Sequence, residues 1–291
     1  MTALASLLPV GLAFIMFALG LKLSGDDFRR VLTHPVPVVL GLLAQTVLLP
    51  LTAFAITVTF SLEPAMAVGL MILAACPGGV SAAMITHLAR GDTCLSITLT
   101  ALTSLLSFVT VPLIVGLSLV HFSGQSGEVG YPVGQGVAGL FLITLLPVAA
   151  GVFVHQAGWL SERMSRFLGA CATAVFALIV VATFVTEWPS ITAHFADIGV
   201  AILLLNALTM ATGAVIGTVG RLPTGGRVAL AVECGIQNSA LGITVAVSLL
   251  AQPALAVPSV IYAFLMNVSA LVLISIRQLQ VGRFGRQAFD S

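Results

Sequence analysis

The feature that most constrains the fold of this chain is a series of apolar stretches, each long enough to cross a lipid bilayer. A helix needs roughly 20 apolar residues to span the hydrocarbon core. Nine such stretches occur, at residues 3–23, 36–60, 65–89, 93–120, 134–154, 168–187, 198–220, 228–251 and 256–276. The connections between them are short, which leaves no room for an inserted soluble domain. We therefore predict an all-α polytopic membrane protein with nine transmembrane helices.

The composition agrees with a surface that faces lipid. Of the 291 residues, 59% are hydrophobic and 7% are charged, whereas a soluble domain carries about 25% charged residues. The net charge of +1 and the absence of a basic patch in the sequence argue against a nucleic-acid partner. The partner that the composition indicates is the lipid bilayer, and it points to no obligatory protein partner.

The basic residues fix the direction of the chain in the membrane. All 11 Lys and Arg residues lie in the segments that follow the first, third, fifth, seventh and ninth stretches, and none follows an even-numbered stretch. Cytoplasmic loops carry the excess of Lys and Arg. We expect a multi-pass protein of the cell membrane with its N-terminus outside and its C-terminus in the cytoplasm. One missed or added helix would destroy this alternation.

The third stretch contains the sequence CPGG, which disfavours a continuous helix. Pro77 restricts Cys76 to extended backbone geometry, and Gly78 and Gly79 make helical backbone costly. One interpretation is a proline kink, which membrane helices tolerate. The other is a helix divided near the middle of the membrane into two half-helices.

The eighth stretch carries the polar sequence ECGIQNS in its middle. An acid at the centre of a membrane helix costs roughly 2.5–3.5 kcal/mol even on the lenient insertion scale. Glu233 is the one acidic residue placed well inside a stretch. It is either a protonated side chain bonded to a neighbouring helix or part of a functional site, and an intramembrane ionisable group indicates the latter by default.

The two disturbed stretches occupy matching places in the chain. Each is the second stretch from the end of its half, an arrangement that points to the binding site of a secondary transporter. Halves of five helices each would be inverted relative to one another. The first half here has four stretches, so we expect two inverted repeats of which the first lacks its first helix.

Four sequence segments, IMFALGL, LLAQTVLLPLTA, CPGGVSAAMITHLARGD and ECGIQNSALG, resemble the bile acid:sodium symporter family (solute carrier family 10), in particular its bacterial homologues of the apical sodium-dependent bile acid transporter. The resemblance implies one transporter domain over 1–291 with two subdomains. A panel would comprise 1–24 and 133–190. A core would comprise 35–120 and 198–277, in which the two discontinuous helices cross.

The resemblance also implies a sodium site for which every side-chain ligand is present. These ligands are the side chains of Gln45, Glu233 and Gln237 and the main-chain carbonyls of Cys234 and Ile236. A hard cation prefers oxygen ligands, and an unwound helix exposes carbonyls that supply them. A cation beside Glu233 would balance its buried charge.

A second sodium site of the family is incomplete in this chain. Ser96 and Thr100 are present, and Glu233 would be shared between the sites. Relatives continue CPGG with Thr-Ala-Ser-Asn, whereas this chain has alanine at both positions where Ser and Asn would donate oxygens, Ala82 and Ala83. Without the resemblance, Ser96 and Thr100 are more typical of hydroxyls that bond back to their own helix or pack between helices. We expect one Na⁺ as the cofactor and leave the second ion open.

No stretch contains Lys or Arg in its interior, since Lys22 lies at the very end of the first, so a substrate anion would have to bind to neutral donors. Candidates are the N–H groups of Gly79, Val80 and Ser81 at the start of the second half-helix, and the side chains of Asn238 and Asn267. In bile-acid-binding relatives Thr and His stand where this chain has Val80 and Met266. The resemblance therefore favours a small carboxylate, such as a keto acid or pantoate, over bile acid.

The function that follows is sodium-coupled symport of an organic anion by alternating access between panel and core. An alternative is a proton-coupled or uncoupled carrier of the same anions with at most one sodium site. An intramembrane hydrolase built on Glu233 would need a paired acid, a nucleophile with its base, or a metal cluster, and the stretches provide no convincing set. We therefore expect a transporter with no catalytic residues.

Overall fold

The computed structural model describes residues 2–25, 29, 32–123 and 133–287, and within these ranges the chain is helical without a named strand. The first half contains α1 (Thr2–Gly20), α3 (Pro35–Leu43), α4 (Leu49–Thr59), α5 (Pro64–Ala75), α6 (Ala82–Leu88) and α7 (Thr93–Ser123). The second contains α8 (Val133–Leu140), α9 (Leu146–Gln156), α10 (Glu162–Thr186), α11 (Trp188–Val219), α12 (Thr224–Gly235), α13 (Ser239–Thr244) and α14 (Val257–Gln287). An all-α membrane protein is what the apolar stretches predict.

Six helical segments of the described chain are long and apolar enough to cross a membrane, and each overlaps one expected stretch. They are Pro35–Thr59, Thr93–Phe122, Gly134–Gln156, Glu162–Thr186, Ile198–Val219 and Pro253–Leu279. Three expected stretches remain. One is α1, whose apolar part Leu7–Gly20 is shorter, and the others are the two disturbed stretches, the third and the eighth. Those two are each divided into a pair of shorter helices, α5 with α6 and α12 with α13.

Two of the long helices contain a wide π turn immediately before a proline. The segment Ala44–Leu48 joins α3 to α4 ahead of Pro50, and Phe141–Leu145 joins α8 to α9 ahead of Pro147. Proline lacks the N–H for an ordinary helical bond, and its ring crowds the carbonyl one turn earlier. The helix widens instead of breaking, and the first of these π turns carries Gln45.

α11 differs from the expected stretch at its N-terminal end. The stretch was placed at 198–220, but the helix begins at Trp188, one residue after α10 is capped by Glu187. Pro189 lies in the first turn of α11, where a missing N–H and a fixed φ are tolerated. The polar residues of this segment therefore extend the helix rather than forming a loop.

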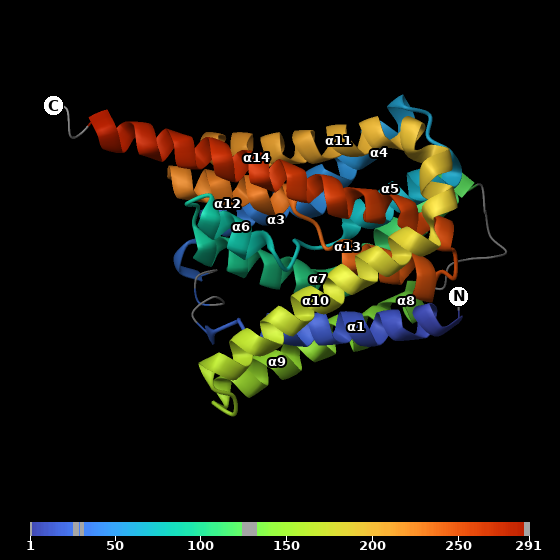
Figure 1. Ribbon diagram of the computed structural model, residues 1–291, viewed down its shortest axis with the longest axis horizontal. Coiled ribbons are helices and arrows are strands. Elements are labelled where there is room, and N and C mark those ends of the chain that lie inside the picture. The colour runs from blue at the N-terminus through green and yellow to red at the C-terminus, as the bar shows by residue number, and fades with distance from the viewer. Residues whose placement is uncertain (1, 26–28, 30–31, 124–132, 288–291) are drawn as a thin grey trace.

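The helices fall into two groups in Figure 1. α1, α9 and α10 lie together along the lower side, and α11, α12 and α14 lie along the upper side with α3 to α6. α1 packs against both α9 and α10. At the crossing with α9, Gly20 and Gly151 face each other so closely that a methyl group on either would strike the main chain of the other helix.

Apolar side chains cover the surface of the molecule, and the divided helices are buried in its centre. Large apolar side chains such as Leu117 and Val219 project outward, 71% and 77% exposed, as in a helix that faces lipid. Residues 66–79 and 228–246 are buried without interruption. Thus α5, α12 and α13 lie in the centre, and their polar residues are enclosed by the other helices.

Several turns that carry basic residues meet at one end of the molecule. The Asp92 N–H donates to the Gly225 carbonyl at 2.9 Å, which joins the α6–α7 turn to the α11–α12 turn. Lys22, after α1, lies beside Gly169 of α10. In Figure 1 these turns, the start of α10 and the end of α14 all lie toward the left, as the charge alternation predicts for one side of a membrane.

Candidate functional site

The two divided helices cross, and each fills the hydrogen-bonding needs of the other. The Gly79 N–H donates to the Ile236 carbonyl at 2.7 Å, and the Asn238 N–H donates to the Pro77 carbonyl at 2.9 Å. Gly78 and Gln237 form an isolated antiparallel bridge at the same point. Buried backbone groups need such partners. The segment at Pro77 is therefore a full interruption of the helix and not a kink.

Glycine is required at this crossing because there is no room for a side chain. A methyl group at Gly78 would strike the Glu233 carboxylate. One at Gly79 would lie 3.0 Å from both the Gln237 carbonyl oxygen and the Ile236 Cγ2 atom. The Pro-Gly-Gly sequence therefore both ends α5 and lets α12 approach.

Glu233 lies at the centre of this crossing and is fully buried. The Ser96 hydroxyl makes a short hydrogen bond to the Glu233 carboxylate. The Thr100 hydroxyl donates to both carboxylate oxygens, at 2.9 and 3.1 Å. Both hydroxyls come from one face of α7, four residues apart. They point at the acid, whereas the neighbouring Thr103 hydroxyl bonds back to its own helix.

Two glutamine side chains flank the acid from other directions. Gln45 Nε2, on the π turn, donates to the Glu233 carbonyl at 2.6 Å. Gln237 Nε2 donates to the Cys234 carbonyl at 2.9 Å. The amide oxygens of both glutamines are buried and lack a hydrogen-bond partner among the described residues. A buried amide oxygen without a partner is costly unless a ligand takes its place.

These groups form an oxygen-rich environment that fits a monovalent hard cation. One carboxylate, two amide groups and the carbonyls at the C-terminal end of α12 come together, and the nearest basic residue in the sequence is Arg227, in the first turn of α12. Oxygen ligands are what such cations prefer. The Ile236 carbonyl also accepts the Gly79 N–H. A cation bound to this carbonyl would therefore share the oxygen with the first divided helix.

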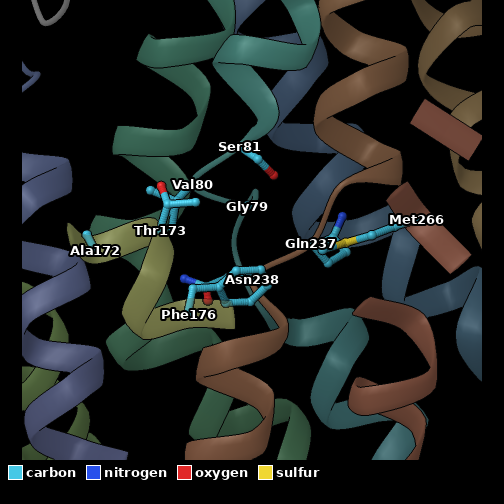
Figure 2. Close-up of a pocket in the computed structure, with 9 residues that line it drawn as sticks. All are labelled: Gly79, Val80, Ser81, Ala172, Thr173, Phe176, Gln237, Asn238 and Met266. Atoms are coloured by element: carbon cyan, nitrogen blue, oxygen red, sulfur yellow. The ribbon is translucent and has the colours of Figure 1, made fainter. Parts of the chain in front are cut away.

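A small cavity of about 30 Å³ lies beside the crossing. Figure 2 shows the side chains that surround it: Gly79, Val80, Ser81, Gln237 and Asn238 from the two interruptions, Met266 from α14, and Ala172, Thr173 and Phe176 from α10. Four of the five expected substrate-binding residues line it. The α10 residues were not predicted, because small and apolar residues of a membrane helix carry no signal in the sequence.

The donors available in the cavity differ from those expected. The Gly79 N–H is already engaged by the Ile236 carbonyl. Asn238 accepts the Leu241 N–H at 3.1 Å through its side-chain oxygen and so caps α13, which leaves its buried Nδ2 without a partner in the described chain. Asn238 is therefore the side-chain donor best placed for an anion.

Asn267 does not join this group. Its side chain is exposed on α14 and donates to the Ala263 carbonyl of its own helix at 2.6 Å. The preceding residue, Met266, faces the cavity instead. One residue corresponds to a rotation of about 100° around a helix, so neighbouring positions lie on different faces.

The fold and site together define a class, the polytopic all-α membrane proteins, here with a buried acid where two divided helices cross. The chain belongs to the sodium bile acid symporter family, whose family model matches residues 9–194. It is 30% identical over 260 residues to the rice protein named "Probable sodium/metabolite cotransporter BASS2, chloroplastic". The aligned region covers 88% of this chain and 60% of the rice protein.

Two further relatives show the breadth of the similarity. The Bacillus subtilis protein named "Uncharacterized sodium-dependent transporter YocS" is 28% identical over 277 residues, or 94% of this chain and 83% of its own. The human "Ileal sodium/bile acid cotransporter" is 28% identical over 178 residues, 61% of this chain and 50% of that protein. This chain thus spans about 60% of the rice relative's length. The relatives are transporters, not enzymes.

Proposed function

We propose that the chain is a secondary transporter that couples inward movement of sodium to uptake of a small organic anion. The observation that carries this proposal is the burial of Glu233 between two glutamines whose amide oxygens have no partner in the described chain. The printed names of the rice and Bacillus relatives, which call them sodium-dependent or sodium cotransporters, support the ion.

The cation would be held by the residues expected from the sequence. Gln45, Glu233 and Gln237 would supply side-chain oxygens, and Cys234 and Ile236 would supply carbonyls. The carboxylate also receives two hydroxyls of α7, Ser96 and Thr100, which keep it oriented without adding charge. Because Ala82 and Ala83 contribute no further oxygen, we propose one bound sodium ion.

The anion would bind in the cavity between the crossing and α10. Asn238 Nδ2 has no partner among the residues that the structure describes, and Ser81 lies at the start of α6. Val80, Phe176 and Met266 give the wall an apolar part. This wall suits a carboxylate with a short carbon skeleton, such as a keto acid or a pantoate-like compound.

Transport would follow alternating access. α1, α9 and α10 would form a panel against the remaining core helices, with the cavity at their boundary. Nine transmembrane segments in two inverted repeats, with the N-terminus outside and the basic turns in the cytoplasm, would complete the arrangement.

Uptake into proteoliposomes tests the proposal. The purified chain should accumulate a labelled short-chain carboxylate, drawn from a panel of keto acids and hydroxy acids, when sodium is imposed outside. It should not do so with matched potassium. Uptake driven equally well by a proton gradient in sodium-free buffer would instead favour the proton-coupled carrier, for which the two alanines after CPGG are the supporting observation.

A further inference from the structure

The C-terminal end of α12 presents four successive carbonyls that the helix itself does not satisfy. The last bond within the helix runs from the Ile236 N–H to the Val232 carbonyl at 2.8 Å. Beyond it, the Glu233 carbonyl accepts Gln45, the Cys234 carbonyl accepts Gln237, and the Ile236 carbonyl accepts Gly79. Each of these belongs to the crossing already described.

The remaining carbonyl, that of Gly235, points away from the crossing and has two donors. Asn206 Nδ2, from α11, donates to it at 2.8 Å. The Tyr262 hydroxyl, from α14, donates to it at 2.9 Å. Asn206 Nδ2 also lies 3.1 Å from the Tyr262 hydroxyl oxygen, so the three groups form a closed triangle. Asn206 and Tyr262 are 0% and 1% exposed.

A carbonyl oxygen has two lone pairs, and these two donors from different helices fill both, which restricts the orientation of the Gly235 carbonyl. The peptide unit is planar, and a fixed Gly235 carbonyl therefore fixes the whole Gly235–Ile236 peptide. The Cys234 carbonyl is separated from this unit only by the two dihedrals of Gly235. Glycine is the residue least able to hold those dihedrals by itself.

Gly235 cannot be replaced by a stiffer residue, because α11 lies against it. A methyl group there would strike the Met210 side chain. Gly213, one turn after Met210 on α11, lets this helix approach the Leu230 carbonyl of α12 equally closely. The close packing places Asn206 within reach of α12, and it leaves external hydrogen bonds as the means of fixing the glycine.

We infer that Asn206 and Tyr262 are positioning residues that fix the Gly235 carbonyl and thereby aim the Cys234 and Ile236 carbonyls at the cation. They touch neither the cation nor the substrate. Their role mirrors that of Gln45, since an amide from the long helix preceding each divided helix bonds to the same end of α12. This inference rests on the proposed function, because it assumes a cation at that end.

The test measures sodium affinity by the melting temperature of the full chain in detergent. NaCl is titrated against choline chloride at constant ionic strength, since a ligand that binds only the folded form raises the melting temperature by mass action. Tyr262→Phe removes one oxygen atom, and Asn206→Leu removes the amide at similar volume. Thr144→Val is the matched control, because its buried hydroxyl bonds to its own helix, at Leu140.

We expect the half-saturating sodium concentration to rise roughly fivefold to tenfold in each of the two variants, the effect of one lost hydrogen bond. The melting temperature without sodium should also fall somewhat in both variants, because a buried hydrogen bond is lost there too, and the control should bind sodium normally. If Asn206→Leu does not fold, Tyr262→Phe decides. The inference would be overturned if the half-saturating sodium concentration did not change. It would also be overturned if a lower melting temperature without sodium were the only effect of the substitutions. If wild type itself shows no sodium-specific rise, the proposed function fails first.

Discussion

At the scale of single residues, Glu233 is acceptable inside a membrane protein because its surroundings are built for it. Two hydroxyls of α7 donate to the carboxylate, and the amides of Gln45 and Gln237 turn their nitrogens toward α12 carbonyls. What remains unmatched is oxygen, on both amides. A structural hydrogen-bond network would pair these buried oxygen acceptors with donors. An excess of acceptors around an acid instead suits a cation, which binds to oxygen atoms.

Gly78→Ala tests how closely the acid and the first divided helix must approach. The added methyl group would meet the Glu233 carboxylate, and overpacking of a tight core costs about 1–3 kcal/mol. We expect a lower melting temperature and a loss of sodium-specific stabilisation. Gly134→Ala, where an added methyl group meets nothing within 4 Å, is the control. A Gly78→Ala protein that melts and binds sodium like wild type would contradict the close approach.

At the scale of elements, the interruptions do two tasks at once. They end α5 and α12 in the buried centre, where main-chain groups have no water, and they pair those groups across the crossing. They also leave side chains at the new helix starts, Ser81 before α6 and Asn238 before α13, facing the cavity against α10. Under the proposed function, the same break in the helix would supply both the carbonyls for the cation and the donors for the anion.

The N-terminal turn of α6 is where a second cation site would be completed. Ala82 is buried and Ala83 half-buried there, and neither offers an oxygen. The double substitution Ala82→Ser with Ala83→Asn should therefore raise the Hill coefficient for sodium in uptake or in thermal stabilisation from about one toward two. Ser165→Ala, a half-buried change in the first turns of α10, serves as a handling control. Sodium dependence that stays the same in the double variant would mean that the missing oxygens do not limit the ion count.

At the scale of the whole molecule, the sequence predicts the helices and their interruptions better than the contacts between helices. The long apolar stretches and the Pro-Gly-Gly interruption follow from hydropathy and backbone chemistry, which are local. The stretch 198–220 agrees with the apolar span Ile198–Val219, but the sequence did not show that α11 continues through polar residues to Trp188, where its first turn tolerates Pro189. Asn267 lies away from the cavity and bonds to its own helix, and a stretch alone does not reveal which face of a helix points inward.

The parts of the site that escaped prediction depend on contacts between distant helices. Thr173 and Phe176 of α10 enter the cavity wall only because α10 packs beside the crossing. Asn206 and Tyr262 are single polar residues on separate helices, and nothing in their sequence neighbourhoods links them to Gly235. The motif around Glu233 was visible in the sequence because its residues lie close together in the chain.

Direct binding of radioactive sodium to the purified chain tests the central claim most directly. Wild type should bind about one displaceable ion per chain. Glu233→Gln should weaken binding roughly tenfold to a hundredfold, because an interaction with a charged group contributes about 1.5–3 kcal/mol. Glu162→Gln, a matched change at the exposed start of α10, should bind as wild type does. Absence of sodium binding in wild type, or undiminished binding in Glu233→Gln, would contradict a cation site at the crossing of the divided helices.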